Sequence, residues 1–245
     1  MTKHIAAKIE GTAVRAIDAV RLLPRRLWRL FVHFAGGIKG LLGSAKKTGL
    51  PVSPYSLWWL EFTFYLLDLL AVPEIYETLM DWSKWKTRPL TGEEEQLARS
   101  VYGKSINYKR VRIDESAKIV CRAHHIYYVS FFTINAWKPF RPDIFIHEMM
   151  HVWQFQHLGG IYIPHALLAQ KTLLGYNYGG LAALEACKKK GGGFADFNME
   201  QQADIVTDYF CLREGLMPNW CPPDAGLAMP VFGYFIEELR DGFLR

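Results

Sequence analysis

The segment 144–155 constrains the fold more than any other part of the chain. Its apolar residues fall on nearly every face of a helix; they are Ile144, Phe145, Ile146, Met149, Val152, Trp153 and Phe155. Such a helix is predicted to be buried. It nevertheless carries His147, Glu148 and His151, and buried ionisable groups need partners. The chain must therefore fold so that other elements enclose this helix and bring polar groups to it.

Composition agrees with a folded chain that has a sizeable core. Half of the 245 residues are hydrophobic and 22% are charged, which excludes a disordered or collagen-like protein. The four cysteines form no C-x-x-C pair and no zinc-knuckle spacing, so we expect reduced thiols and a cytoplasmic protein. Pairing of Cys211 with Cys221 stays open for an exported chain. Peripheral membrane association and export without a cleavable signal peptide are the alternatives for its location.

Charge is distributed unevenly along the chain. Residues 1–50 hold ten Lys/Arg against two acids, whereas the rest hold nineteen against twenty-two. Apolar residues in this basic segment recur at helical spacing, as in Ile5, Ile9 and Ile17, and Trp28 follows. This pattern is typical of a helix on an anionic membrane surface, and equally of a helix packed on the protein's own core with a solvated basic face. No nucleic-acid-binding motif accompanies the charge, so we expect no nucleic acid partner.

Two apolar stretches resemble membrane spans but contain charges. The stretch 27–42 is interrupted by Arg29 and Lys39, and 56–72 contains Glu61 and Asp68. Acids at mid-bilayer depth are costly, so a buried helix is expected over 56–72. The first residues of the chain lack the uninterrupted apolar core of a secretory signal.

The periodicity predicts an α+β fold. Helices are expected at 56–71, 74–85, 92–102, 143–158, 164–174, 198–213 and 231–244, and strands at 106–113, 117–122 and 126–134. Thr91 and Glu94 form a capping box, Asp143 is expected to cap the central helix, and Asn198 is expected to cap a later one. We predict a basic helical segment (1–50), a helical region (51–90) packed on the domain that follows it, and a mostly helical domain with a small sheet (91–245).

The central helix contains the sequence H-E-x-x-H. His147 and His151 are one turn apart on one helix face, so both imidazoles can reach one metal ion. Glu148 lies about 100° round the helix and can act as a general base without being a ligand. A hydrogen-bonded core cluster is the structural alternative.

A catalytic zinc site needs a third protein ligand, and two residues are candidates. His157 has the spacing of a metzincin ligand, but Gln154 stands where that pattern requires a helix-breaking glycine. Glu200 lies one turn before Asp204, which can accept the free ring N–H of a ligand histidine. The candidates for stabilising a developing oxyanion are His165, Tyr176 and Tyr178, and the sequence does not choose among them.

With these residues, the sequence resembles the gluzincins, zinc peptidases in which H-E-x-x-H is followed by E-x-x-x-D on a later helix. More narrowly, it is similar to a bacterial metallopeptidase domain found with phage-tail-like contractile injection and type VI secretion systems. The similarity covers about residues 91–213 and includes 95–103, 111–113 and 146–154. One departure is the gap of 48 residues between His151 and Glu200, which is longer than in compact gluzincins.

The resemblance implies a zincin-like domain that uses Zn²⁺ to hydrolyse peptide bonds. His147, His151 and Glu200 would be the metal ligands, Glu148 the general base and Asp204 the support of a ligand. The implied partners are a peptide or protein substrate and a membrane or secretion apparatus contacted through residues 1–50. The alternative is a non-catalytic component of a secretion apparatus that keeps zinc for stability.

Overall fold

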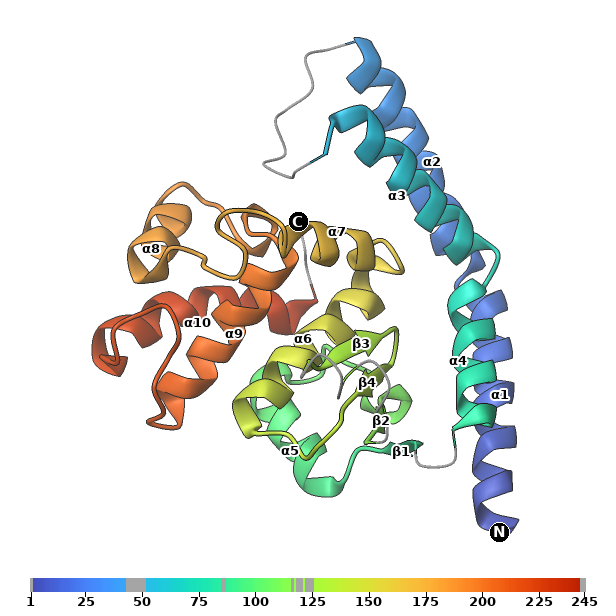
Figure 1. Cartoon of the computed structure of the whole chain (residues 1–245). Helices are drawn as coiled ribbons and strands as arrows, with labels where there is room; N and C mark the ends of the chain where they lie inside the picture. The colour runs from blue at the N-terminus through green and yellow to red at the C-terminus, as the bar shows by residue number, and fades with distance from the viewer. Residues whose placement is uncertain are drawn as a thin grey trace.

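The computed structural model describes residues 2–42, 52–84, 87–115, 117, 121 and 126–242. Figure 1 shows two parts, an elongated arm of four helices and a body that lies beside it. The arm consists of α1 (Thr2–Arg21), α2 (Leu23–Leu42), α3 (Pro54–Leu69) and α4 (Val72–Ser83). α1 pairs with α4 and α2 pairs with α3, so the arm is a helical hairpin. The boundaries predicted at residues 50 and 90 stay predictions.

The body contains the sheet and the remaining helices. Its elements in chain order are β1 (Thr87–Pro89), α5 (Gly92–Tyr102), η1 (Tyr108–Arg110), β2 (Arg112–Asp114), β3 (Tyr128–Ser130), β4 (Thr133–Asn135), α6 (Pro142–Leu158), α7 (Tyr162–Ala169), α8 (Gly180–Lys189), η3 (Phe194–Asp196), α9 (Met199–Arg213) and α10 (Ala225–Asp241). The α+β class expected from the periodicity is confirmed.

The sheet is small and mixed. Its order is β1-β2-β4-β3, with β2 and β4 parallel and the two outer pairs antiparallel. Ile113 and Ile134 stand opposite each other in register, and both are fully buried. β3 is therefore an edge strand of the described sheet, and β4 separates it from α6 along the chain.

The core forms where α5, α6, α9 and α10 meet. α6 and α9 share the most extensive contact among the described elements. As expected, α6 is buried along its length, and Ile146, Met149 and Trp153 have no exposed surface. Tyr102 of α5 donates a hydrogen bond of 2.6 Å to the Ile146 carbonyl, which fixes α5 against the helix that carries the histidines.

Two of the predicted caps are present. Thr91 and Glu94 form the capping box at the start of α5, and Asn198 with Gln201 forms another at the start of α9. Asp143 is not the cap of α6. The cap position is Arg141, and Pro142 occupies the first turn, where its missing N–H is no loss.

Several predicted boundaries are wrong. The expected strand 106–113 contains the 3₁₀ turn η1, and only its last residues join β2. The expected strand 126–134 is a hairpin of two short strands, because Phe131 adopts a left-handed conformation (φ 58°) between them. The expected strand 117–122 lies mostly outside the described residues. α8 was not predicted, and α10 begins six residues before the expected position and includes Pro230.

The helix expected to be buried over 56–72 is only half buried. Within α3 only Leu57 and Asp68 are buried, whereas Tyr55, Trp59 and Leu66 are exposed. Asp68 accepts the Gly160 N–H at 2.8 Å, so the acid that argued against a membrane span joins the arm to the body. In the described part of the chain, no helix has the length and apolar character needed to cross a membrane.

Candidate metal centre

Two helices bring His147, His151 and Glu200 together. The histidines lie one turn apart on α6, and Glu200 lies in the first turn of α9, whose start is fixed by the Asn198 capping box. Each of the three residues offers one ligand atom, and these atoms all lie within 4.8 Å of one another. Glu200 is almost fully buried, at 1% exposure. The structure thus assembles the three residues that the sequence analysis grouped as a metal site.

The separation of the ligand atoms suits a single small ion. Oε2 of Glu200 lies 3.5 Å from Nε2 of His147 and 3.5 Å from Nε2 of His151. Ligands bound tetrahedrally at 2.0–2.2 Å are about 3.4 Å apart. These pairs are also too long to be good hydrogen bonds, so the three atoms face a shared point without satisfying one another.

The remaining polar atom of each candidate ligand is held by another side chain. Nδ1 of His147 lies 2.9 Å from Oδ1 of Asp204, as the sequence analysis predicted. Nδ1 of His151 lies 2.8 Å from Oε1 of Gln154, and Oε1 of Glu200 accepts a 2.8 Å hydrogen bond from Gln170. Such contacts orient ligands and direct their free lone pairs at the metal position.

The hydrogen bonds of Gln154 determine which proton His151 carries. Gln154 is fully buried, and its Nε2 donates to the Met199 carbonyl and to Oε1 of Gln202, each at 2.9 Å. The amide oxygen must therefore be the atom that faces His151, so the ring donates from Nδ1. That tautomer leaves Nε2 of His151 with a free lone pair directed toward Glu200.

The electrostatics of the cluster favour a cation. Burial alone would lower the pKa of His147, but its hydrogen bond to Asp204 and the nearby carboxylate of Glu200 raise that pKa to about 10. Burial would raise the pKa of Glu200, but the two histidines hold it well below its usual range. Carboxylates that stabilise positive charge this strongly would stabilise a divalent ion as well.

Two buried oxygen atoms show whether a zinc ion would fit among these residues. Oε2 of Glu200 and Oε2 of Glu148 are both buried and have no hydrogen-bond partner among the described residues. A buried carboxylate oxygen without a partner is costly, and a metal ion or the water beside it would satisfy both atoms. Two imidazoles and one carboxylate form a donor set that zinc favours. The residues therefore fit the group that the sequence implied.

His157 lies elsewhere. Its ring stacks on Trp153 at 4.1 Å between ring centres, and its Nδ1 lies 2.9 Å from the Trp153 carbonyl. Because α6 continues to Leu158, His157 lies on a different face of the helix from His151. The structure does not bring His157 to the other two histidines.

A comparison with known proteins finds a bacterial secretion protein. Over 138 residues, the chain is 35% identical to the type VI secretion system spike protein VgrG2b of Pseudomonas aeruginosa. The match covers 50% of this chain and 13% of that protein, so the chain spans a small part of its relative's length. No protein-family model matches the chain, and no solved structure matches it at a significant level.

A cleft of about 610 Å³ opens over the three candidate ligands and Glu148. Its other walls are mainly apolar and aromatic, with β3 on one side and α7 on another; they include Ile126, Val129, Phe131, Ile163, Leu167 and Tyr176. The arm contributes Val72 and Tyr76 to the same cleft. The candidate ligands and Glu148 therefore lie at the wall of an open and mainly apolar cleft.

The three oxyanion candidates lie in different places. Tyr176 lines the cleft, and its ring centre is 6.1 Å from that of His147. Tyr178 is buried and donates to Asp208 at 2.7 Å, and Nε2 of His165 lies 2.8 Å from Glu61 of the arm. Of the three, only Tyr176 is near the candidate ligands. Asn198 and Gln201 bond the Gly175 and Asn177 carbonyls, so the start of α9 also holds the loop that carries Tyr176.

The H-E-x-x-H motif predicts no role for Gln154 or Gln170. Gln154 stands where the metzincin pattern has a glycine, but its position three residues after His151 also places it on the adjoining helix face, and this spacing is a signal for the contact. Gln170 follows α7, and no pattern in the sequence connects it with Glu200.

Proposed function

We propose that the chain is a zinc-dependent peptidase associated with type VI secretion. The observation that carries the proposal is the arrangement of Glu200 with the two histidines, in which three ligand atoms face one point and every other polar atom of the ligands is held by a neighbour. A structural core cluster would be expected to satisfy its own polar atoms, and this one leaves two carboxylate oxygens unpaired.

Each residue has a separate role in this proposal. His147, His151 and Glu200 would hold the zinc ion, which would supply Lewis acidity toward the reacting water and the substrate carbonyl. Glu148, beside them in the cleft, would take a proton from the water and pass it to the leaving amine. Tyr176 would donate its phenolic hydrogen to the developing oxyanion.

The substrate would lie along β3. This strand is at the edge of the described sheet, and all three of its residues line the cleft. The Val129 carbonyl accepts a 2.7 Å hydrogen bond from Tyr162 of α7, which holds the strand beside the candidate ligands. A peptide paired with this edge would have its backbone held in a fixed register, and the apolar cleft would favour hydrophobic side chains.

A second candidate function is a zinc-stabilised component of the secretion apparatus that cleaves nothing. The similarity to a spike protein favours an association with such an apparatus, and it does not by itself require catalysis. The intact Glu148 favours the peptidase, because a purely structural zinc site does not need a general base.

The variant Glu148→Gln separates the two functions. We expect it to keep zinc, measured by elemental analysis, and to lose about a hundred- to ten-thousandfold in cleavage of a mixed peptide library. Equal cleavage by the variant and the wild type would exclude Glu148 as the base. A wild-type protein that binds zinc, melts at a lower temperature after chelation and cleaves no peptide would support the second function.

A further inference from the structure

The outer surface of the arm is formed by a continuous apolar stripe. The backbone hydrogen bonds from Leu22 to Asp18 and from Arg26 to Leu22 continue the helical pattern from α1 into α2. Large apolar side chains are exposed along this length: Ile5, Ile9, Ile17, Val20, Leu23, Leu27, Trp28, Phe31 and Phe34. Ile17 is 63% exposed and Val20 is 74% exposed. At 100° per residue, most of these side chains fall within one third of the helix circumference.

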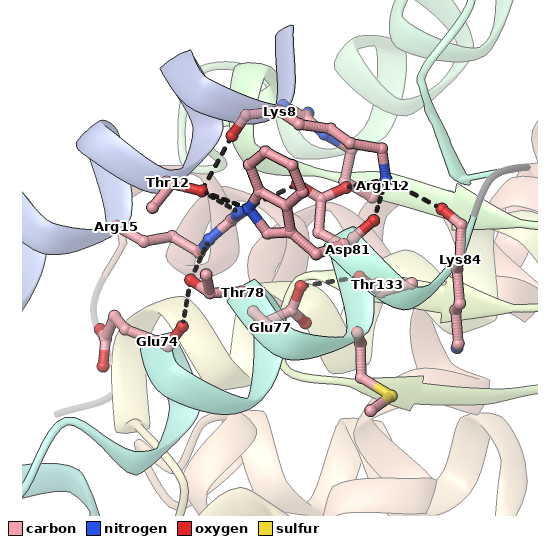
Figure 2. Close-up of polar contacts among 12 residues, drawn as sticks. Lys8, Thr12, Arg15, Glu74, Glu77, Thr78, Asp81, Lys84, Arg112 and Thr133 are labelled. Atoms are coloured by element: carbon pink, nitrogen blue, oxygen red, sulfur yellow. Dashed lines mark hydrogen bonds and ion pairs between the residues drawn. The ribbon is translucent and has the colours of Figure 1, made fainter. Parts of the chain in front are cut away.

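The opposite face of the same helices carries the charges. Figure 2 shows Lys8 and Arg15 of α1 directed at Asp81 and Thr78 of α4. Trp82 of α4 donates to the Thr12 hydroxyl at 2.9 Å. Arg15 binds Asp81 at 2.9 Å, and Lys8 is only 4% exposed. The pattern continues toward α2, where Asp18 pairs with Arg110 of the body and Arg26 pairs with Glu74. The arm thus encloses its charged face and exposes its apolar one.

This arrangement contradicts one of the two alternatives for the basic segment, that of a helix packed on the protein's own core with a solvated basic face. A helix packed on the protein's own core would bury its apolar stripe and solvate its charges, whereas the structure does the reverse. The other two helices of the arm, α3 and α4, also expose apolar side chains. Its exposed side chains include Tyr55, Trp59, Leu66, Leu70, Ile75, Leu79 and Trp82. Exposed apolar surface on this scale indicates a binding partner.

The segment that carries the stripe has an excess of positive charge, with ten Lys/Arg against two acids in residues 1–50. Arg21 is exposed beside the stripe, whereas Arg25 donates to the His157 carbonyl of the body and Glu10 lines a hollow with Arg110 and Arg112 of the body. The other acid of residues 1–50, Asp18, is neutralised by Arg110. Three exposed tryptophans, Trp28, Trp59 and Trp82, add side chains that favour the boundary between water and hydrocarbon.

We propose that the outer stripe of α1 and α2 docks on the surface of a membrane that contains anionic lipids. The apolar side chains would enter the headgroup boundary, and Arg21 would bind a lipid phosphate. A coiled-coil seam is narrower and is flanked by charges of both signs, whereas this stripe is wide and rich in aromatic residues, and its segment has an excess of positive charge. The proposal does not depend on the metal centre.

Vesicle flotation of the full chain tests the proposal. The probe is vesicles of phosphatidylethanolamine with about one third phosphatidylglycerol, compared with pure phosphatidylcholine. The test variant is Ile9→Glu/Ile17→Glu/Leu27→Glu, and these positions tolerate polar groups because they are exposed. We expect the wild type to float with the anionic vesicles and the variant to lose about tenfold or more in partitioning.

The matched control is Leu173→Glu/Met217→Glu/Leu227→Glu. It adds the same charge at three exposed apolar positions outside the arm, so it should float nearly as well as the wild type. Arg21→Gln should weaken binding to the anionic vesicles by about fivefold and leave the weaker binding to phosphatidylcholine unchanged. Glu148→Gln should float like the wild type, which keeps this test separate from the peptidase proposal.

Three results would overturn the proposal. One is a wild type that stays in solution with both kinds of vesicle. Another is equal flotation of the stripe variant and the control. The last is a wild type that forms dimers by light scattering, together with a stripe variant that is monomeric and no lipid binding by either, which would assign the stripe to a second copy of the chain.

Discussion

The arm and the candidate metal centre of the body both bury charged groups, but they do so in different ways. In the arm, Arg26 with Glu74 and Arg15 with Asp81 pair directly, and the apolar residues face outward. Between α6 and α9, the neighbours of the three candidate ligands hold one atom of each and leave the other directed at a common point. Buried charges that pair directly with each other stabilise an assembly, whereas three buried donor atoms that face one point without pairing indicate a ligand. An unpaired atom alone does not make this distinction, because Nη1 of Arg26 and Oε2 of Glu74 also have no hydrogen-bond partner among the described residues.

The largest effect is expected from Glu200→Ala. Loss of one of three ligands should lower zinc affinity by well over a hundredfold, which is more than the effect of losing a supporting residue. Zinc content and competition with a chelator measure it. His157→Ala is the control and should keep full zinc. Full zinc occupancy in Glu200→Ala would show that Glu200 is not a ligand, and the proposed difference from the arm would then be wrong.

The next largest effect is expected in the arm, where Glu74→Ala is compared with Ile17→Glu. The first leaves the guanidinium of Arg26 buried without its acid, and should lower the free energy of unfolding by about 3–5 kcal/mol. The second introduces a charge at an exposed apolar position, and should change the free energy of unfolding by less than about 0.5 kcal/mol. Urea denaturation measures both. The opposite ranking would mean that the stripe is buried in solution.

A smaller effect is expected from Gln154→Leu. Without the amide oxygen, His151 loses the partner that fixes its tautomer, so zinc affinity should fall roughly ten- to a hundredfold while the fold persists. Gln156→Leu on the same helix is the matched control, because its side chain bonds the Asn107 backbone and not a candidate ligand. Equal zinc affinity in the two variants would contradict the role of Gln154.

The smallest effect is expected from the titration of Glu77, which joins the arm to the sheet. Its carboxylate accepts hydrogen bonds from the Phe132 N–H and the Thr133 hydroxyl, and burial raises its pKa to about 7. Arg15 opposes this shift and Asp81 adds to it. Between about pH 4.5 and 7 the unfolded chain has lost this proton while the folded chain keeps it, so stability falls as pH rises through that window.

Glu77→Gln should remove this dependence. When the pH rises from 5 to 8, the free energy of unfolding of the variant should increase by on the order of 1–3 kcal/mol relative to that of the wild type. Chemical denaturation at the two pH values measures the difference. Glu95→Gln, at an exposed carboxylate, is the control and should show no comparable gain. A Glu77→Gln variant whose stability follows the wild type at both pH values would show that the carboxylate titrates normally.

The sequence was informative where contacts are local. The i, i+4 spacing of His147 and His151 and that of Glu200 and Asp204 lie within single helices, so helical periodicity alone predicted which side chains share a face. The capping residue Asn198 located the start of α9 within one residue. These regularities hold whatever the rest of the chain does.

What the sequence could not supply depends on how elements pack. Periodicity grouped Ile5, Ile9 and Ile17 on one face, but it does not say whether that face turns inward or outward. The outcome depends on acids far along the chain, such as Asp81 and Glu74, that attract the basic face. Gln170 meets Glu200 across 30 positions, and such a contact has no signature in either segment.

The attachment of the arm also fixes an orientation. Asp68 holds the Gly160 N–H beyond the end of α6, Arg25 donates to the His157 carbonyl, and Val72 and Tyr76 form part of the cleft. A surface that held the outer stripe would therefore hold the cleft at one height and one tilt above it. The distance of a peptide bond from that surface would then decide whether it is cleaved, as strictly as the side chains around it. A bond at the wrong distance would stay intact even if its flanking sequence fitted the cleft.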